Sequence, residues 1–176
     1  LMQCNTNYTA NKENTLYLNL NVLNQYRKIF DKSVILGLSD HTSGHNSVLG
    51  AVALGARVIE KHFTDDNLRE GPDHKFSMNP KTWEQMVLET RILEKSLGDG
   101  SKKVELNENN SIIVQRRGIR AKKKLFKGDK ITEQMLVYLR PCPRTALNPY
   151  EKSKIIGKTL TRDILKGDII TCEKTK

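Results

Sequence analysis

The amino-acid sequence predicts an α/β fold followed by a small, mostly β unit. Apolar, β-branched stretches alternate with helical periodicity in residues 1–98, whereas short extended pieces and Gly-Asp turns fill residues 116–176. The charge changes with the pattern: residues 1–100 contain 11 Lys and Arg against 12 Asp and Glu, and residues 101–176 contain 19 against 8. This combination predicts two units with different roles.

The first unit is expected to contain three strand–helix pairs. The expected elements are the end of a strand at 1–4, a helix ending at Ile29, a strand over 34–38, a helix over 47–56, a strand over 57–61 and a helix over 80–97. Asn79 and Pro80 supply an N-cap and a first helical residue for the last helix, and Gly98 ends it. Strands joined through helices are expected to lie parallel.

Three parallel strands are too few to close on themselves. A closed (β/α)8 (TIM) barrel needs eight strands and about 250 residues. Because the chain also opens inside a strand, we expect residues 1–98 to be the C-terminal part of such a barrel within a longer protein.

Residues 99–115 are polar and are expected to form a linker. Beyond it, the stretches 127–132 and 166–171 are near-duplicates that each place a Gly-Asp turn before a β-branched pair. This repeat predicts a compact, pseudo-symmetric, mostly β domain over residues 116–176.

Two histidines, His41 and His62, each follow a predicted strand, so they are expected at the same carboxyl edge of the sheet. Neutral imidazoles bind divalent metals such as Mn, Fe, Co and Zn, which makes an open Lewis-acid site one interpretation. The neighbouring Asp40 and Glu60 are expected to orient the rings. The alternative is a pair of ordinary hydrogen-bonded core histidines. His45 is expected to be a helix-cap or surface residue.

Composition excludes several classes of protein. With 37% hydrophobic and 28% charged residues and no long apolar run, the chain is expected to be a globular protein without a membrane partner. Three cysteines without metal-type spacing favour free thiols and a cytoplasmic location. Only 6% aromatic residues argue against base stacking and hence against a nucleic-acid partner. The basic half is then either an ordinary solvated surface, the more common case, or a surface that attracts a phosphorylated small molecule or another anion.

Several motifs taken together resemble the sialic acid synthase (N-acetylneuraminate synthase) family. The similar segments in the first unit are Leu1–Cys4 with Tyr8, Gly37–Thr42, Gly50–Ala56, Ile59–Thr64, Gly71–His74 and Ser77–Pro80. Residues 118–176 resemble the antifreeze-like (SAF) domain of the same family, through Lys127–Asp129, Leu139–Pro141 and Ile156–Lys158.

The resemblance implies an enzyme that condenses phosphoenolpyruvate with an open-chain N-acetylated amino sugar, giving a nine-carbon 2-keto acid and phosphate. It implies that His41 and His62 are the protein ligands of a divalent metal, Mn²⁺ or Mg²⁺. By the same resemblance Asp73 holds sugar hydroxyls and Tyr8 is an active-site aromatic residue.

Further roles come from the same resemblance. Ser39 and Thr6, in the turn Asn5–Asn7, match positions near the phosphate. Arg140 matches an arginine that reaches into the partner subunit's barrel in a domain-swapped homodimer. A basic lid over a site for an anionic substrate would explain the step in charge.

The chain also departs from the family. Thr9 stands where many members have proline, and the extra-basic segment Arg140–Arg144 replaces a glycine-containing loop, which leaves the sugar open between N-acetylmannosamine and a di-N-acetylated relative. The family keeps other substrate-binding residues in the first half of the barrel, so this chain is expected to be inactive alone. The alternative is a non-catalytic remnant whose basic SAF module binds a carbohydrate or anion.

Overall fold

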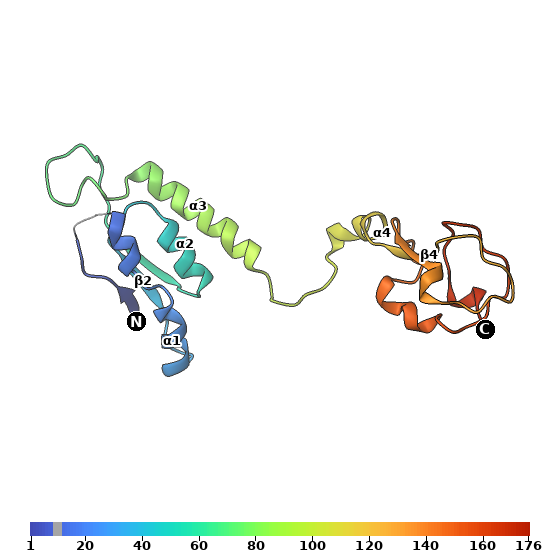
Figure 1. Cartoon of the computed structure of the whole chain (residues 1–176). Coiled ribbons are helices and arrows are strands. Elements are labelled where there is room, and N and C mark those ends of the chain that lie inside the picture. Colours follow the sequence, from blue (N-terminus) through green and yellow to red (C-terminus); the bar gives the residue numbers. More distant parts are fainter. Residues whose placement is uncertain (9–11) are drawn as a thin grey trace. The chain divides into compact units, whose positions relative to one another are not determined.

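The computed structural model describes residues 1–8 and 12–176, so Thr9 lies outside the described residues. The chain folds into two compact units, Leu1–Ser101 and Lys102–Lys176 (Figure 1).

The first unit contains a parallel sheet of three strands in the order β1-β2-β3, which confirms the predicted parallel neighbours. The strands are β1 (Met2–Cys4), β2 (Gly37–Asp40) and β3 (Val58–Lys61). Strand β2 begins later than the predicted residue 34, because the first residue of β1, Met2, pairs with Gly37. A Cβ atom at Gly37 would lie 2.6 Å from the carbonyl oxygen of Val58, so only glycine fits where β2 and β3 approach each other.

Three α-helices follow the strands: α1 (Val22–Ile29), α2 (Asn46–Ala53) and α3 (Pro80–Leu97). The first predicted helix is instead a 3-10 helix, η1 (Lys12–Tyr17), and the separate α1. Between them Asn19 has a φ of 45°, a left-handed conformation that an α-helix cannot contain. Helix α3 begins as predicted, with a capping box between Asn79 and Thr82.

In the described part of the chain, helices α1, α2 and α3 pack on one face of the sheet, and the opposite face is called the open face. Side chains alternate along a strand, so Leu38 and Asp40 of β2 point to the same face, where Leu38 is fully buried beneath α1 and α2. On this open face Val58 of the edge strand is 43% exposed, whereas Ser39 of the central strand is 7% exposed. Parallel sheets are normally covered on both faces, so this open face is an unusual feature of the unit.

Two apolar clusters on the covered side fix the helices. The buried members are Leu23, Leu36, Leu38, Ala51 and Ala56 beneath α1 and α2, and Val48, Val52, Met78 and Met86 between α2 and α3. Ile59 of β3 contacts both clusters and so joins the three helices to the sheet.

The second unit is built on one antiparallel pair, β4 (Gly118–Ala121) with β5 (Leu136–Leu139), and on isolated bridges. Its short helices are η2 (Leu106–Glu108), α4 (Ser111–Gln115), η3 (Glu133–Met135), η4 (Pro149–Lys154) and η5 (Cys172–Lys174). Its buried core comprises Ile119, Ala121, Leu125, Ile131, Leu136, Ile155, Leu160, Ile164 and Ile170.

The two near-duplicate stretches form equivalent turns. Gly128 and Gly167 have φ values of 96° and 87°, the left-handed conformation that these turns require. The strand residues just before the turns, Leu125 and Ile164, pair with each other in an antiparallel bridge. The repeat therefore produces the pseudo-symmetry of the β unit.

Part of the expected linker over 99–115 is ordered structure. The second unit includes residues from Lys102 onward, with η2 and α4 in this stretch. The amide of Cys142 donates to the carbonyl of Ile113 at 2.8 Å, which attaches α4 to the β unit.

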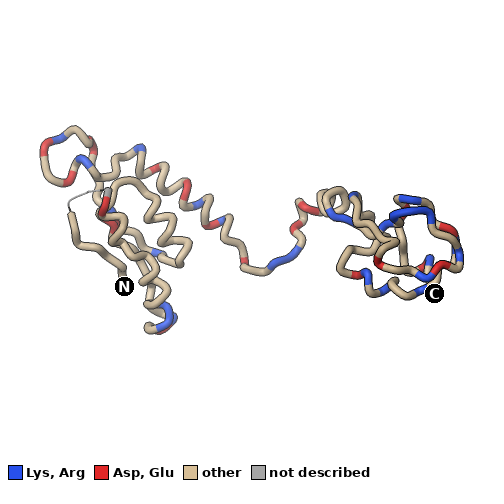
Figure 2. The backbone as a smooth tube through the Cα atoms, viewed as in Figure 1, with Lys and Arg blue, Asp and Glu red and all other residues tan. Residues whose placement is uncertain are grey.

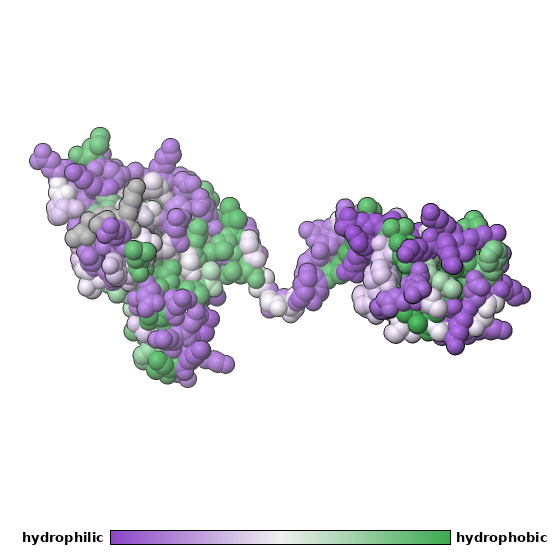
Figure 3. All heavy atoms as spheres, viewed as in Figure 1, coloured by the Kyte–Doolittle hydropathy of each residue, from purple (hydrophilic) through white to green (hydrophobic). Residues whose placement is uncertain are grey.

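The surfaces of the two units differ in charge and polarity. Lys and Arg residues are frequent along the backbone of the second unit (Figure 2), and its visible face is mostly hydrophilic (Figure 3). Apolar side chains remain exposed on α3 of the first unit, among them Leu88 (58% exposed) and Ile92 (64%). No helix in the described part of the chain is long and apolar enough to cross a bilayer.

The capping box of α3 gives a direct test of the fold. In Asn79→Ala the amide of Thr82 loses its side-chain acceptor, and we expect the free energy of unfolding to fall by about 1 kcal/mol in chemical denaturation. Asn21→Ala is the matched control, because Asn21 precedes α1 without a side-chain capping bond. Equal losses in both variants would contradict the capping role of Asn79.

Candidate functional site

The two predicted histidines lie together at the carboxyl edge of the sheet. Asp40 and Lys61 are the last paired residues of β2 and β3, so His41 and His62 occupy the next position of the same register. Their ring centroids are 5.2 Å apart, in an edge-on arrangement. The ring of Tyr8 lies 4.1 Å from that of His41 and 5.6 Å from that of His62. The structure thus brings together three of the candidate residues.

In each of the two imidazoles the Nδ1 atom faces an oxygen atom of the protein. Nδ1 of His41 is 2.9 Å from the carbonyl oxygen of Asn5, and Nδ1 of His62 is 3.6 Å from Oδ2 of Asp73. Neither Nε2 atom has a hydrogen-bond partner among the described residues. A carbonyl or carboxylate behind one ring nitrogen is the usual support of a metal-binding histidine.

The expectation that Asp40 and Glu60 orient the rings is wrong for both residues. Asp40 points to the helix-covered face, where its Oδ2 accepts hydrogen bonds from Lys61 Nζ (2.7 Å) and from Ser47 Oγ. Glu60 accepts a hydrogen bond from Ser39 Oγ at 2.6 Å across the sheet. The alternation of side chains along a strand turns Asp40 away from His41, and the cross-strand partner Ser39 engages Glu60.

Burial and pairing have opposite effects on Asp40. Burial raises the pKa of its carboxyl group, but the ammonium group of Lys61 and hydrogen bonds from Lys61, Ser47 and Thr42 lower the pKa more. The net pKa lies below the ordinary value, so Asp40 is ionised at neutral pH and forms an ion pair with Lys61.

Asp73 lies on a loop that hydrogen bonds order. Asn67 Nδ2 donates to the carbonyls of His74 (2.7 Å) and Ser77 (2.9 Å), and Asn67 Oδ1 accepts from Asn79 at 2.8 Å. Ser77 Oγ donates to the carbonyl of Asp73 at 2.7 Å. The loop therefore presents the Asp73 carboxylate beside His62 from a fixed backbone.

The remaining predicted residues have different surroundings. Ser39 lies on the open face, bonded to Glu60, and Thr6 is exposed after β1. Arg140 belongs to the second unit, where its Nε donates to the carbonyl of Gln115 at 2.6 Å and its side chain is exposed. Arg140 and the two histidines therefore belong to different units of the chain.

The donor set limits how a metal ion would be held. No group of three or more His, Cys, Asp or Glu side chains in residues 1–8 and 12–176 has the arrangement of a metal site. Two imidazoles with unengaged Nε2 atoms do fit a borderline divalent ion that takes further ligands from water or substrate.

A third histidine, His45, is the N-cap residue of α2, as expected. Its Nε2 atom lies 2.7 Å from Oε2 of Glu89.

Three contributors to the site escaped sequence reasoning. The Asn5 carbonyl could not be predicted, because every residue has a backbone carbonyl and the sequence does not show which one meets a ring. The ring of Phe76 lies 5.0 Å from that of His62, but Phe76 belongs to a loop whose path the sequence does not predict. The sequence could have indicated Lys61, because a charged residue at an inward-facing position of a buried strand needs an oppositely charged or hydrogen-bonding partner.

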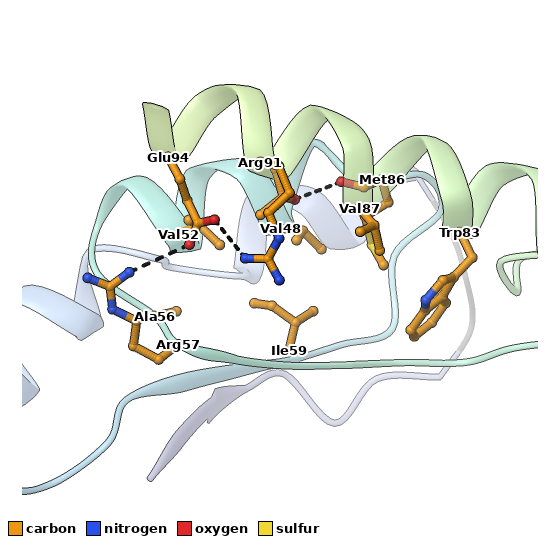
Figure 4. Close-up of a pocket in the computed structure, with 11 residues that line it drawn as sticks. Val48, Val52, Ala56, Arg57, Ile59, Trp83, Met86, Val87, Arg91 and Glu94 are labelled. Carbon is orange, nitrogen blue, oxygen red and sulfur yellow. Dashed lines mark hydrogen bonds and ion pairs between the residues drawn. The ribbon is translucent and has the colours of Figure 1, made fainter. Parts of the chain in front are cut away.

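A separate cavity of about 220 Å³ lies between α2, β3 and α3. Figure 4 shows that Trp83 and Val87 point from α3 toward Ile59 of β3, and that Arg91 and Glu94 line the cavity further along α3. Arg91 and Glu94 form an ion pair at 2.7 Å. The lining is largely apolar and lacks a histidine or cysteine, so the histidine pair remains the stronger candidate site.

The structure thus consists of an α/β unit with two neighbouring histidines at the carboxyl edge of its parallel sheet, and a small β unit. Residues 1–102 match the NeuB family, and residues 116–174 match the SAF domain. The chain belongs to the NeuB family and carries a SAF domain, which confirms the resemblance found in the sequence.

Named relatives agree with this assignment. The chain is 36% identical over 170 residues to an N,N'-diacetyllegionaminic acid synthase of Campylobacter jejuni, covering 97% of this chain and 49% of the relative. It is 30% identical over 169 residues to the human N-acetylneuraminate-9-phosphate synthase, covering 96% of this chain and 46% of the relative. The chain thus spans about half the length of the curated relatives it matches.

Solved structures show the same fold. A spore coat polysaccharide biosynthesis protein E from Chromobacterium violaceum matches 99% of this chain and 52% of its own, with a TM-score of 0.67 at 23% identity. An N-acetylneuraminic acid synthetase from Leptospira borgpetersenii, solved with citrate, matches 64% of this chain and 38% of its own, with a TM-score of 0.54 at 33% identity.

The loop that carries Asp73 can be tested through Asn67. In Asn67→Ala the carbonyls of His74 and Ser77 lose their donor, and we expect the local opening free energy of the loop to fall by about 1–3 kcal/mol. Native-state hydrogen exchange of the Ser77 and Met78 amides measures it. Leu68→Ala, at a side chain that is 91% exposed, is the control, and unchanged exchange in Asn67→Ala would contradict this role.

Proposed function

We propose that this chain contributes to a synthase that condenses phosphoenolpyruvate with an N-acetylated amino sugar, giving a nine-carbon sialic-acid-type 2-keto acid and phosphate. The observation that carries the proposal is the His41–His62 pair, with both Nδ1 atoms facing protein oxygens and both Nε2 atoms unengaged. Membership of the NeuB family supports the reaction class.

We infer that the three-stranded sheet is part of a (β/α)8 barrel. The uncovered face of the parallel sheet carries Ser39, Glu60 and both histidines, which is the position of an interior wall in a barrel. Exposed apolar residues on α3, such as Ile92, support a neighbouring helix in the complete protein. The other strands of such a barrel would supply further substrate contacts, so we expect this chain to be inactive alone. The three free cysteines support a cytoplasmic location for the complete enzyme.

A divalent ion, Mn²⁺ or Mg²⁺, would be held by His41 and His62 and would supply Lewis-acid polarisation of the sugar aldehyde. The Asn5 carbonyl and the Asp73 carboxylate lie at the Nδ1 atoms of the two imidazoles, so the Nε2 atoms are the ones that would hold the ion. Tyr8 lies against both rings and limits the access of water to them.

The remaining residues are proposed to bind substrate. Asp73 accepts hydrogen bonds from sugar hydroxyls, while Ser39 and Thr6 lie toward the phosphate of phosphoenolpyruvate. Arg140, exposed on the basic second unit, is proposed to reach the sugar in a partner subunit's barrel within a domain-swapped homodimer. The excess of Lys and Arg in residues 101–176 supports such a lid, because phosphoenolpyruvate is an anion.

The same basic surface supports one other candidate, a non-catalytic module that binds a carbohydrate or an anion. The histidine pair distinguishes the two functions. A binding module of this kind needs no metal at His41 and His62, whereas the synthase does.

Manganese binding tests the proposed centre. In the full-length protein we expect His41→Ala and His62→Ala each to weaken Mn²⁺ binding by about 100-fold or more, because each removes one of two protein ligands. Electron paramagnetic resonance of free Mn²⁺ measures the affinity. His45→Ala is the matched control, since that ring bonds Glu89 instead. Wild-type affinity in both ligand variants would remove the metal assignment.

Steady-state kinetics test the lid. In Arg140→Ala we expect the KM for the amino sugar to rise about tenfold and the KM for phosphoenolpyruvate to change less, because one charged hydrogen bond to the sugar is lost. Arg144→Ala, an exposed arginine in the same segment, is the control. Sugar kinetics like those of the wild type would refute the role of Arg140.

A further inference from the structure

The buried Asp40–Lys61 ion pair joins the two chain segments that carry the histidines. Asp40 immediately precedes His41, and Lys61 immediately precedes His62. The two are cross-strand partners in the register of β2 and β3, and their side chains lie on the helix-covered face, opposite the histidines. The side chain of Asp40 is 0% exposed and that of Lys61 is 2% exposed.

Stability of the fold alone does not explain a charged pair at this buried position. Removing two charges from water costs several kcal/mol for each ion, and apolar residues of similar volume often give equal or greater stability. Leu38 on β2 and Val48 on α2 are fully buried on the same covered side, and the polar contacts of the pair are with the buried residues Thr42 and Ser47. The pair therefore calls for an explanation beyond packing.

The hydrogen bonds of the pair converge on Thr42, the residue after His41. Asp40 Oδ1 accepts from the amide and the hydroxyl of Thr42, at 2.9 and 2.8 Å. Lys61 Nζ donates to the Thr42 carbonyl and to Asp40 Oδ2, both at 2.7 Å. The backbone on both sides of His41 is thus tied to the residue just before His62, and separating the two strand ends would break charged, buried hydrogen bonds.

We propose that the Asp40–Lys61–Thr42 cluster is a positioning device that sets the spacing of the two imidazoles, and so the affinity of the metal site. Ser47 of α2, which also donates to Asp40, anchors the cluster to the helix layer. This inference rests on the proposed metal role of His41 and His62. Its residues touch no ion or substrate, and they act through the backbone that carries the ligands.

The experiment separates positioning from stability in the full-length protein. The double variant Asp40→Asn/Lys61→Met removes both charges at nearly constant volume, and we expect its metal-free melting temperature to stay within a few degrees of the wild type. Its Kd for Mn²⁺ should rise about 10-fold to 100-fold, the usual cost of losing the support behind metal ligands. Lys61→Met alone leaves a buried unpaired carboxylate and should lower both melting temperature and affinity.

The matched control is Arg91→Met/Glu94→Gln, which removes an exposed ion pair on α3 and should change neither quantity. Wild-type Mn²⁺ affinity in a folded double variant overturns the positioning role. If the double variant does not fold, Thr42→Val decides, because it keeps both charges and removes only the hydroxyl contacts of Thr42, to Asp40 at 2.8 Å and to Ser47 at 3.5 Å. A severalfold loss of affinity supports the proposal, and an unchanged affinity overturns it. Failure of the metal site itself would appear separately, as unchanged Mn²⁺ binding in His41→Ala and His62→Ala.

Discussion

The pairing of β2 with β3 is the constraint on which the rest of this structure depends. The register Gly37↔Val58 through Asp40↔Lys61 decides which side chains share a face of the sheet. If β2 slipped by one residue along β3, Asp40 would move to the open face and His41 into the helix layer, while Lys61 and His62 would keep their faces. Gly37 protects this register, because any side chain there would collide with the Val58 carbonyl. Function and folding therefore depend on the same backbone contact.

The sheet carries different chemistry on its two faces. The covered face contains apolar residues and one paired charge, whereas the open face carries Ser39, Glu60 and the histidines. A buried pair on one side of a strand can fix a reactive group on the other side, because both belong to a single backbone. This arrangement connects the apolar interior with the proposed chemistry at the sheet edge.

Sequence patterns predicted much of the first unit and of the candidate site. Helix α3 and its Asn79 cap, the parallel strands, and the nearness of His41 to His62 all followed from local periodicity and from the geometry of strands joined by helices. The break between η1 and α1 did not follow, because the left-handed Asn19 leaves the apolar spacing unchanged. Local sequence also gave no sign that residues after Lys102 pack onto the second unit.

The sequence by itself determined that two histidines follow successive parallel strands, since chain order and strand period require only local information. The tertiary structure alone decided their partners. It placed the Asn5 carbonyl behind His41, paired Ser39 with Glu60, and directed Asp40 to Lys61 instead of to a ring. The physical reason is that a hydrogen bond depends on which face a side chain takes and on what lies across the sheet. Those facts exist only once the strands have paired.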